Sequence, residues 1–120
     1  MNTAVQDRTN VMCGLEAIRM LSQIAEACAM CVLERGHDVE LVKFAAHCSD
    51  RAEHIAQYLI DSPTTSWSLD FVLEEMSWLI KHELLLERVR VSVMRTIPTV
   101  DDLEKCKQRS RLICSTGCVQ

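Results

Sequence analysis

The chain has 120 residues, a net charge of −4, a hydrophobic fraction of 48% and a charged fraction of 25%. This length and balance fit one globular domain with a buried core and exclude a disordered chain. The acidic charge argues against binding to nucleic acid, which needs a basic face. Only 3 Gly and 2 Pro are present, which favours helices over strands. We expect an all-α fold, a four-helix bundle or four-helix globule, as a single domain over residues 1–120.

The N-terminal residues lack the basic start and apolar core of a signal peptide, and no uncharged apolar run is long enough to span a bilayer. The 7 Cys are odd in number and accompany no export signal, so reduced thiols are expected rather than a disulfide scaffold. These observations predict a cytoplasmic protein that neither enters a membrane nor binds nucleic acid.

The first two helices are predicted at about residues 10–35 and 38–60. Asn10 is suited to cap the first helix, Gly36 to end it and Asp38 to cap the second. So short a link favours an antiparallel pair. Apolar residues spaced by 4 and 3 predict the buried stripes: Ala17, Leu21, Ile24, Cys28 and Cys31 in the first helix, and Leu41, Ala45, Cys48, Ala52, Ile55 and Leu59 in the second.

The third helix is predicted at about residues 68–95, as a long central element. Its first half has an apolar stripe that runs into charged positions when it is continued into the second half. Either the helix bends near His82, or its second half packs against something other than the first two helices. Residues 88–93 also alternate with a period of two, as strands do; we favour helix because no pairing strand is near. The stripe is Leu69, Leu73, Met76 and Ile80, and the charged positions are Glu83, Glu87 and Arg90.

The fourth helix is predicted at about residues 99–116. Thr99 and Asp102 have the spacing of a capping box. A thin apolar stripe follows it: Leu103, Cys106, Ser110 and Ile113. The loop 61–68 contains Pro63, Trp67 is expected to pack on the end of the bundle, and Ser66 or Ser68 is suited to cap the third helix. Residues 1–9 and 117–120 are expected to be loose ends, with a start of the first helix near Ala4 as the alternative.

The second half of the third helix carries more apolar side chains than the thin fourth helix can cover. An uncovered patch of this kind on a soluble protein marks an interaction surface. We expect a homodimer or another protein partner here, and a two-fold dimer is the simplest closed form. The alternative is that loop 61–68 and the N-terminal residues cover the patch within one chain. The predicted partner surface is Leu84, Leu85, Val89, Val91, Val93 and Met94.

Four cysteines form a candidate metal site. In an up-down-up-down bundle, Cys28, Cys31, Cys48 and Cys106 fall at one level and face the interior. Soft thiolates in such a setting suit copper or zinc. The arrangement is similar in outline to the Cys-lined four-helix bundles that store copper, which carry many more Cys. The alternative is that these Cys are small buried residues that only fill space between helices.

His47, Asp50 and His54 share one face of the second helix, where a surface metal site, a proton relay or an ordinary solvated face are the alternatives. A histidine phosphotransfer role for His47 is disfavoured, because Asp50 and Arg51 follow it where those domains place a Lys and a small residue. The chain contains no nucleophile elbow, metalloprotease motif or nucleotide-binding motif.

These patterns predict a small non-enzymatic protein of the regulatory or adaptor type. It would act by protein–protein interaction and self-associate through its third helix, with no cofactor. The alternative is a thiolate bundle that binds copper or zinc for storage, buffering or sensing.

Overall fold

Five helices make up a computed structural model of the chain: α1 (Asn2–Arg35), α2 (Val39–Asp61), α3 (Asp70–Ile80), α4 (Glu83–Val93) and α5 (Val100–Cys118). The structure describes residues 2–61, 69–93 and 97–118, and in this part of the chain it contains no strand. The predicted all-α class is confirmed. The helices form an elongated body of 52 × 27 × 19 Å. None of the described helices is long and apolar enough to cross a membrane.

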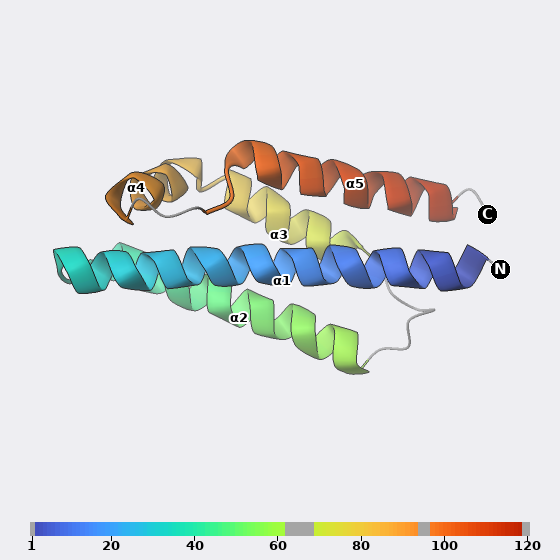
Figure 1. Cartoon of the computed structure of the whole chain (residues 1–120), viewed down its shortest axis with the longest axis horizontal. Coiled ribbons are helices and arrows are strands. Elements are labelled where there is room, and N and C mark those ends of the chain that lie inside the picture. Colours follow the sequence, from blue (N-terminus) through green and yellow to red (C-terminus); the bar gives the residue numbers. More distant parts are fainter. Residues whose placement is uncertain (1, 62–68, 94–96, 119–120) are drawn as a thin grey trace.

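The central element is α1, and it contacts all four other helices. Figure 1 shows α2 along one side of α1, with α3 and α5 along the other. The expected stripe of α1 from Ala17 to Cys31 is buried. The helix begins at Asn2, so the prediction that Asn10 caps it is wrong, and part of the expected loose end at 1–9 is helical. No Gly or Pro occurs before Gly14, so nothing in the sequence interrupts an earlier start.

The turn between α1 and α2 follows the predicted capping pattern. Gly36 has a φ of 103°, which favours glycine, and its N–H donates to the carbonyl of Val32 at 2.9 Å. The Asp38 carboxylate accepts from the N–H groups of Glu40 at 3.1 Å and Leu41 at 3.3 Å. Two long helices are thereby joined as the expected antiparallel pair.

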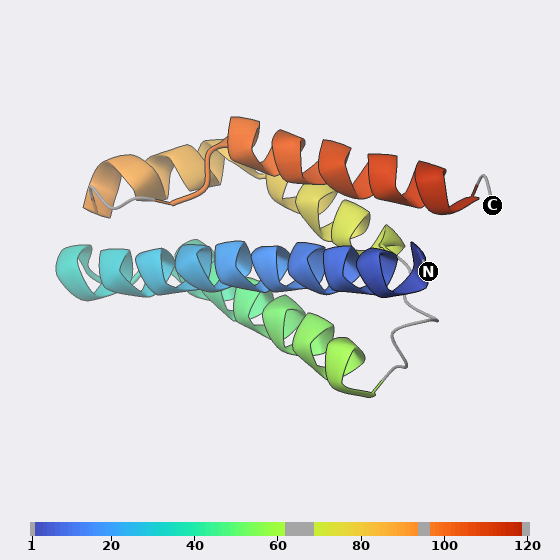
Figure 2. The same ribbon diagram turned by 45° about the vertical axis from the view of Figure 1, so that its right-hand side comes forward.

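The long central third helix is a prediction that the structure corrects, because the segment is divided into two helices of 11 residues each, α3 and α4. The bend near His82, one of the two alternatives, is confirmed. Residues 88–93 are helical, as favoured. Figure 2 shows the chain changing direction between α3 and α4.

The His82 side chain supports the backbone at the break. Its Nδ1 lies 2.8 Å from the carbonyl oxygen of Trp78, the group that would accept the His82 N–H in a continuing α-helix. The His82 N–H donates instead to Leu79 at 2.9 Å. The His82 carbonyl then accepts from Leu85 at 3.1 Å and Leu86 at 3.0 Å and starts α4. A side chain thus takes the place of a backbone donor.

After the break, α4 packs against the turn end of the α1–α2 pair. The Arg35 guanidinium donates to the carbonyl of Ser92 at 3.3 Å, and Arg88 forms an ion pair with Asp38 at 3.1 Å. The helix therefore covers the end of α1 instead of continuing along α3. This position brings its inner face into the core and turns its outer face away from it.

The fifth helix starts beside the middle of α1. Ile97, Pro98 and Asp102 line the same surface cavity as Arg19 and Met20 of α1. The predicted capping box is confirmed, since Thr99 N–H donates to the Asp102 carboxylate at 3.0 Å and Asp102 N–H donates to Thr99 Oγ1 at 3.2 Å.

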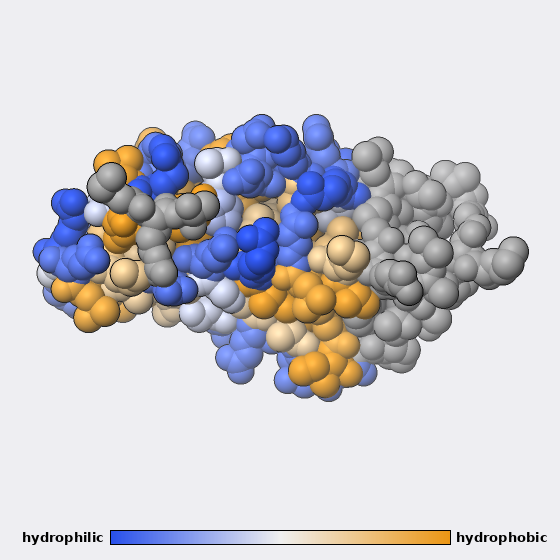
Figure 3. All heavy atoms as spheres, in the orientation of Figure 1, coloured by the Kyte–Doolittle hydropathy of each residue, from blue (hydrophilic) through white to orange (hydrophobic). Residues whose placement is uncertain are grey.

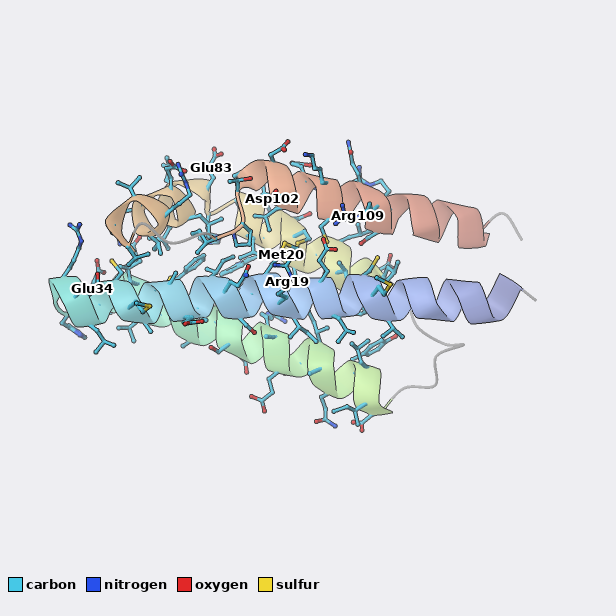
Figure 4. The ribbon with its side chains drawn as sticks, viewed as in Figure 1. Arg19, Met20, Glu34, Glu83, Asp102 and Arg109 are labelled. Atoms are coloured by element: carbon cyan, nitrogen blue, oxygen red, sulfur yellow. The ribbon has the colours of Figure 1, made fainter. Side chains whose placement is uncertain are left out.

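From there α5 runs back along α3 and α1. Arg109 forms an ion pair with Glu16, and Figure 4 shows Arg109 on the side of α5 that faces α1.

The predicted stripe of α1 is buried. In α2, Ala45 and Leu59 of the predicted stripe are half-buried, and Phe44, which was not predicted, is buried. The stripe of α3 differs as well. That helix buries Val72, Glu75, Met76 and Leu79, whereas the predicted stripe had Leu73 and Ile80, which are only half-buried. In α5 the expected residues Leu103, Cys106 and Ser110 are buried, and the side chain of Ile113 lies outside the described part. The N-cap of α3 is Leu69, which makes no side-chain cap hydrogen bond. The proposed roles of Ser66, Trp67, and Ser68 fall outside the described residues.

Candidate functional site

The predicted partner surface on α4 divides into two faces. Leu84 is 84% exposed and Val91 is 64% exposed. Glu87 and Arg88 are exposed between them. Spacings of three, four and seven residues place these four side chains on one stripe. We call this set, Leu84, Glu87, Arg88 and Val91, the outer α4 face.

The other predicted partner residues point into the protein. Val89 is fully buried in the core, so its place in a partner surface is wrong, and Leu85 and Val93 are half-buried against the core. Met94 lies outside the described residues. The sequence pattern grouped all apolar residues of 84–94 together. The structure separates them because α4 packs against the end of α1 as well as presenting a free side.

Further apolar side chains are exposed at the helix ends next to α4. Leu33, in the last turn of α1, is 84% exposed, and Val39, in the first turn of α2, is 53% exposed. The Arg35–Ser92 and Arg88–Asp38 contacts hold α4 against these helix ends. Figure 3 shows apolar patches interspersed with hydrophilic ones at the end of the molecule where α4 lies.

The outer α4 face carries charges of both signs. The Arg90 guanidinium pairs with Glu87 along the helix, and the hydrogen bond to that carboxylate raises the pKa of Arg90. Arg88 pairs with Asp38 of the neighbouring turn. With Glu83, Glu87, Arg88 and Arg90, α4 has two acidic and two basic residues, so two copies of this helix would not repel each other through net charge.

The predicted meeting of four thiols is not what the structure shows. Besides burial, Cys31 contributes to the raised pKa of Cys28, and Cys28 to that of Cys48, whereas Glu16 and Cys13 are the neighbours that raise the pKa of Cys106. The expectation assumed that the last helix begins level with the end of the first. Instead α5 begins beside the middle of α1, which carries Cys106 toward the N-terminal half of α1 and away from Cys28.

The chemistry of the described thiols is that of buried packing groups. Cys13, Cys28, Cys31, Cys48 and Cys106 are buried, and within the described residues they form no disulfide. Burial is the main cause that raises the pKa of Cys28 to about 11 and the pKa values of Cys48 and Cys106 to about 12. These three thiols are therefore protonated at neutral pH. Among the described residues, no group of three or more His, Cys, Asp or Glu side chains is placed to hold a metal ion.

His47 is separated from the other two members of its predicted group. Its ring stacks on Trp78 of α3 with 4.0 Å between centroids, while His54 lies 3.4 Å from the Asp50 carboxylate on the exposed side of α2. Burial and the nearby Arg51 lower the pKa of His47. The predicted His47, Asp50 and His54 face is thus an exposed pair plus a histidine that packs on another helix.

Aromatic rings fill the space between α2 and α3. Phe44 stacks on Trp78 at 5.3 Å between centroids, His82 packs against Trp78 at 4.3 Å, and Tyr58 contacts Phe71 at 4.7 Å. The sequence stripes did not identify this layer, because rings at the edges of two helices do not form a stripe on either one.

Glu75 is the buried charged residue that the sequence reasoning missed. It is 8% exposed, its Oε1 lies 3.4 Å from Nε of Arg51, and its Oε2 has no hydrogen-bond partner. Burial raises the pKa of its carboxyl group, and Arg51 lowers it to a smaller extent. A signal was present in the sequence: Val72, Met76 and Leu79 define a stripe on which position 75 also lies.

Comparisons with known proteins add no relative. No protein-family model matches this chain, and no curated protein or solved structure gives a significant match.

Proposed function

We propose that this protein acts by protein–protein interaction, as a regulatory or adaptor component of the cytoplasm, and that it pairs with a second copy through the outer α4 face. The observation that carries the proposal is the exposure of Leu84 and Val91, at 84% and 64%, on a helix whose other side is in the core. Apolar side chains held on a rigid element are suited to anchor a partner.

An antiparallel two-fold arrangement fits the order of residues on this face. If two copies of α4 meet at the midpoint between Leu84 and Val91, Leu84 of each copy packs on Val91 of the other. The same symmetry places Glu87 opposite Arg88 of the other copy. Apolar residues then meet apolar residues, and opposite charges meet at the centre, as an isologous interface requires.

The neighbouring helix ends would extend this contact. An 11-residue helix is only about 16 Å long, which is short for a stable interface of roughly 800 Å² per partner. Leu33 and Val39 are exposed beside α4 and enlarge the apolar area available to a second copy.

The proposal is tested by comparing Leu84→Glu with a matched control. Ile60 is 74% exposed at the far end of α2, so Ile60→Glu makes the same kind of change away from the proposed interface. We expect Leu84→Glu to weaken self-association about tenfold or more, which corresponds to roughly 1.4 kcal/mol. Light scattering across a micromolar concentration series measures this.

The expected result is a wild-type dimer that is kept by Ile60→Glu and lost in Leu84→Glu. A wild-type chain that stays monomeric throughout the series would overturn self-association through α4. Equal weakening by both substitutions would also overturn it, because the effect would then not depend on α4.

The thiolate metal-binding alternative has less support, because Cys106 lies with Glu16 and Cys13 rather than with Cys28 and Cys48.

A further inference from the structure

A second surface feature is a groove formed by α3 and α5, with one residue of α2. It has a volume of about 470 Å³, which is within the usual range for small-molecule sites. Figures 1 and 2 show α3 and α5 running side by side. The helices that form this groove do not include α4, which carries the outer α4 face. Its lining residues are Arg51, Leu73, Glu74, Glu75, Ser77, Trp78, Lys81, Lys107 and Arg111.

Four basic side chains line this groove, although the chain as a whole has a net charge of −4. Arg51 comes from α2, Lys81 follows α3, and Lys107 and Arg111 come from α5. Among the ion pairs of the described residues, none involves Lys81, Lys107 or Arg111. Glu74 and Glu75 also line the groove, and Glu75 pairs with Arg51, so four basic side chains face two acidic ones. The excess cations repel one another, and an anion between them relieves that repulsion.

Arg51 is held in place at the edge of the groove. Its Nε lies 3.4 Å from Oε1 of Glu75 and donates to Nε2 of His47 at 3.4 Å. Both contacts use Nε, and Arg51 also lines the groove. Because Glu75 is 8% exposed and His47 stacks on Trp78, the groups that position Arg51 are themselves fixed by packing.

We propose that this groove binds a ligand through its phosphate group. Guanidinium and ammonium groups supplied by α2, by α5 and by the residue after α3 suit an anion with several acceptor oxygens better than a single carboxylate. The hydroxyl of Ser77 is available as a further donor on the same wall. Leu73 and Trp78 provide apolar surface for an organic part of the ligand. The phosphate can belong to the free ion or to a small phosphomonoester, and the shared chemistry is the dianionic group.

The test is isothermal titration of the full chain with inorganic phosphate and, separately, with adenosine monophosphate at low salt. Lys107→Gln and Arg111→Gln remove cations from the groove. Lys105→Gln is the matched control, since Lys105 is on the same helix but pairs with Asp101 at 3.0 Å and is not a lining residue of this groove. We expect each groove substitution to weaken binding about tenfold and the control to leave it unchanged.

Tighter binding of adenosine monophosphate than of phosphate would identify the phosphomonoester as the source, and equal binding would identify the free ion. Wild-type protein that binds neither probe at millimolar concentration would overturn the proposal. If Lys105→Gln lost as much affinity for the probes as the groove variants do, the proposal would also be overturned, because the effect would then reflect the overall charge of the chain. Circular dichroism of each variant confirms that the helices are retained.

Discussion

The buried Glu75 holds Arg51 in place at the surface of the protein. The Glu75 carboxyl group is enclosed between α3 and α2, and it forms an ion pair with Arg51 at 3.4 Å. A buried carboxylate with an unpaired oxygen reduces stability, and protonation lessens that cost. We attribute its presence to the positioning of Arg51 beside the α3–α5 groove.

His47 leads to a prediction about pH. Its pKa lies below the usual 6.5, mainly because of burial and secondarily because of Arg51. The unfolded chain therefore takes up a proton at this residue at a higher pH than the folded chain does. The free energy of unfolding should fall as the pH drops through 6.5 toward the lower pKa of the folded state. We expect wild-type protein to lose stability over this interval relative to His47→Gln.

The measurement is urea unfolding of both proteins at a series of pH values. Glu75 contributes with the opposite sign, since its raised pKa makes the folded state take up a proton first. Because Glu75 is common to both proteins, the difference between their curves isolates His47. His37→Gln, in the exposed α1–α2 turn, serves as the control. Curves for wild type and His47→Gln that stay parallel across the interval would rule this explanation out.

At the scale of the elements, the helices with regular stripes were predictable. The antiparallel pair, its glycine C-terminus, the Asp38 cap and the Thr99–Asp102 capping box all follow from local spacing, and the structure confirms them. The exact division of the third predicted helix was not predictable. The pattern indicated a change of face near His82, but a bend and a different packing partner both explained it.

The His82 side chain carries a prediction for the α3–α4 break. His82→Ala removes the group that bonds the Trp78 carbonyl and the ring that packs on Trp78 at 4.3 Å. A buried carbonyl without a partner costs roughly 1–3 kcal/mol, and the partly buried Trp78 carbonyl is expected at the lower end of this range. We expect the free energy of unfolding to fall by about that amount in urea titrations at neutral pH.

His37→Ala is the matched control, because His37 is exposed in the α1–α2 turn. It should change the stability by no more than about 0.5 kcal/mol. If His82→Ala were as stable as this control, the His82 side chain would not be what supports the break.

At the scale of the whole molecule, the position of α5 could not be predicted. Local sequence patterns indicate which face of each helix is buried. They do not indicate where along the neighbouring helix it begins. The sequence argument placed the start of the last helix at the end of the first, and the thiol hypothesis depended on that level. In the structure, the break at His82 sends α4 across the end of α1, and α5 starts beside Arg19 and Met20. Cys106 therefore lies beside the N-terminal half of α1, near Glu16 and Cys13, and not beside Cys28.

The same rearrangement divides the predicted partner surface into exposed and buried residues. Of the six residues predicted for it, Leu84 and Val91 are exposed, and Val89 belongs to the core. Leu84 and Val91 flank the charged residues Glu87 and Arg88, which the apolar pattern alone did not select. The proposed two-fold pairing depends on this mixed stripe.

The most direct test of the pairing is a charge exchange between two variants. Glu87→Arg places Arg opposite Arg88 of a second copy, and Arg88→Glu places Glu opposite Glu87, so each variant alone repels itself. When the two are mixed, each of these positions faces the opposite charge. Sedimentation velocity should show monomers for each variant alone and a heterodimer for the equimolar mixture. A mixture that sediments as the sum of its two components would contradict an antiparallel α4 pair.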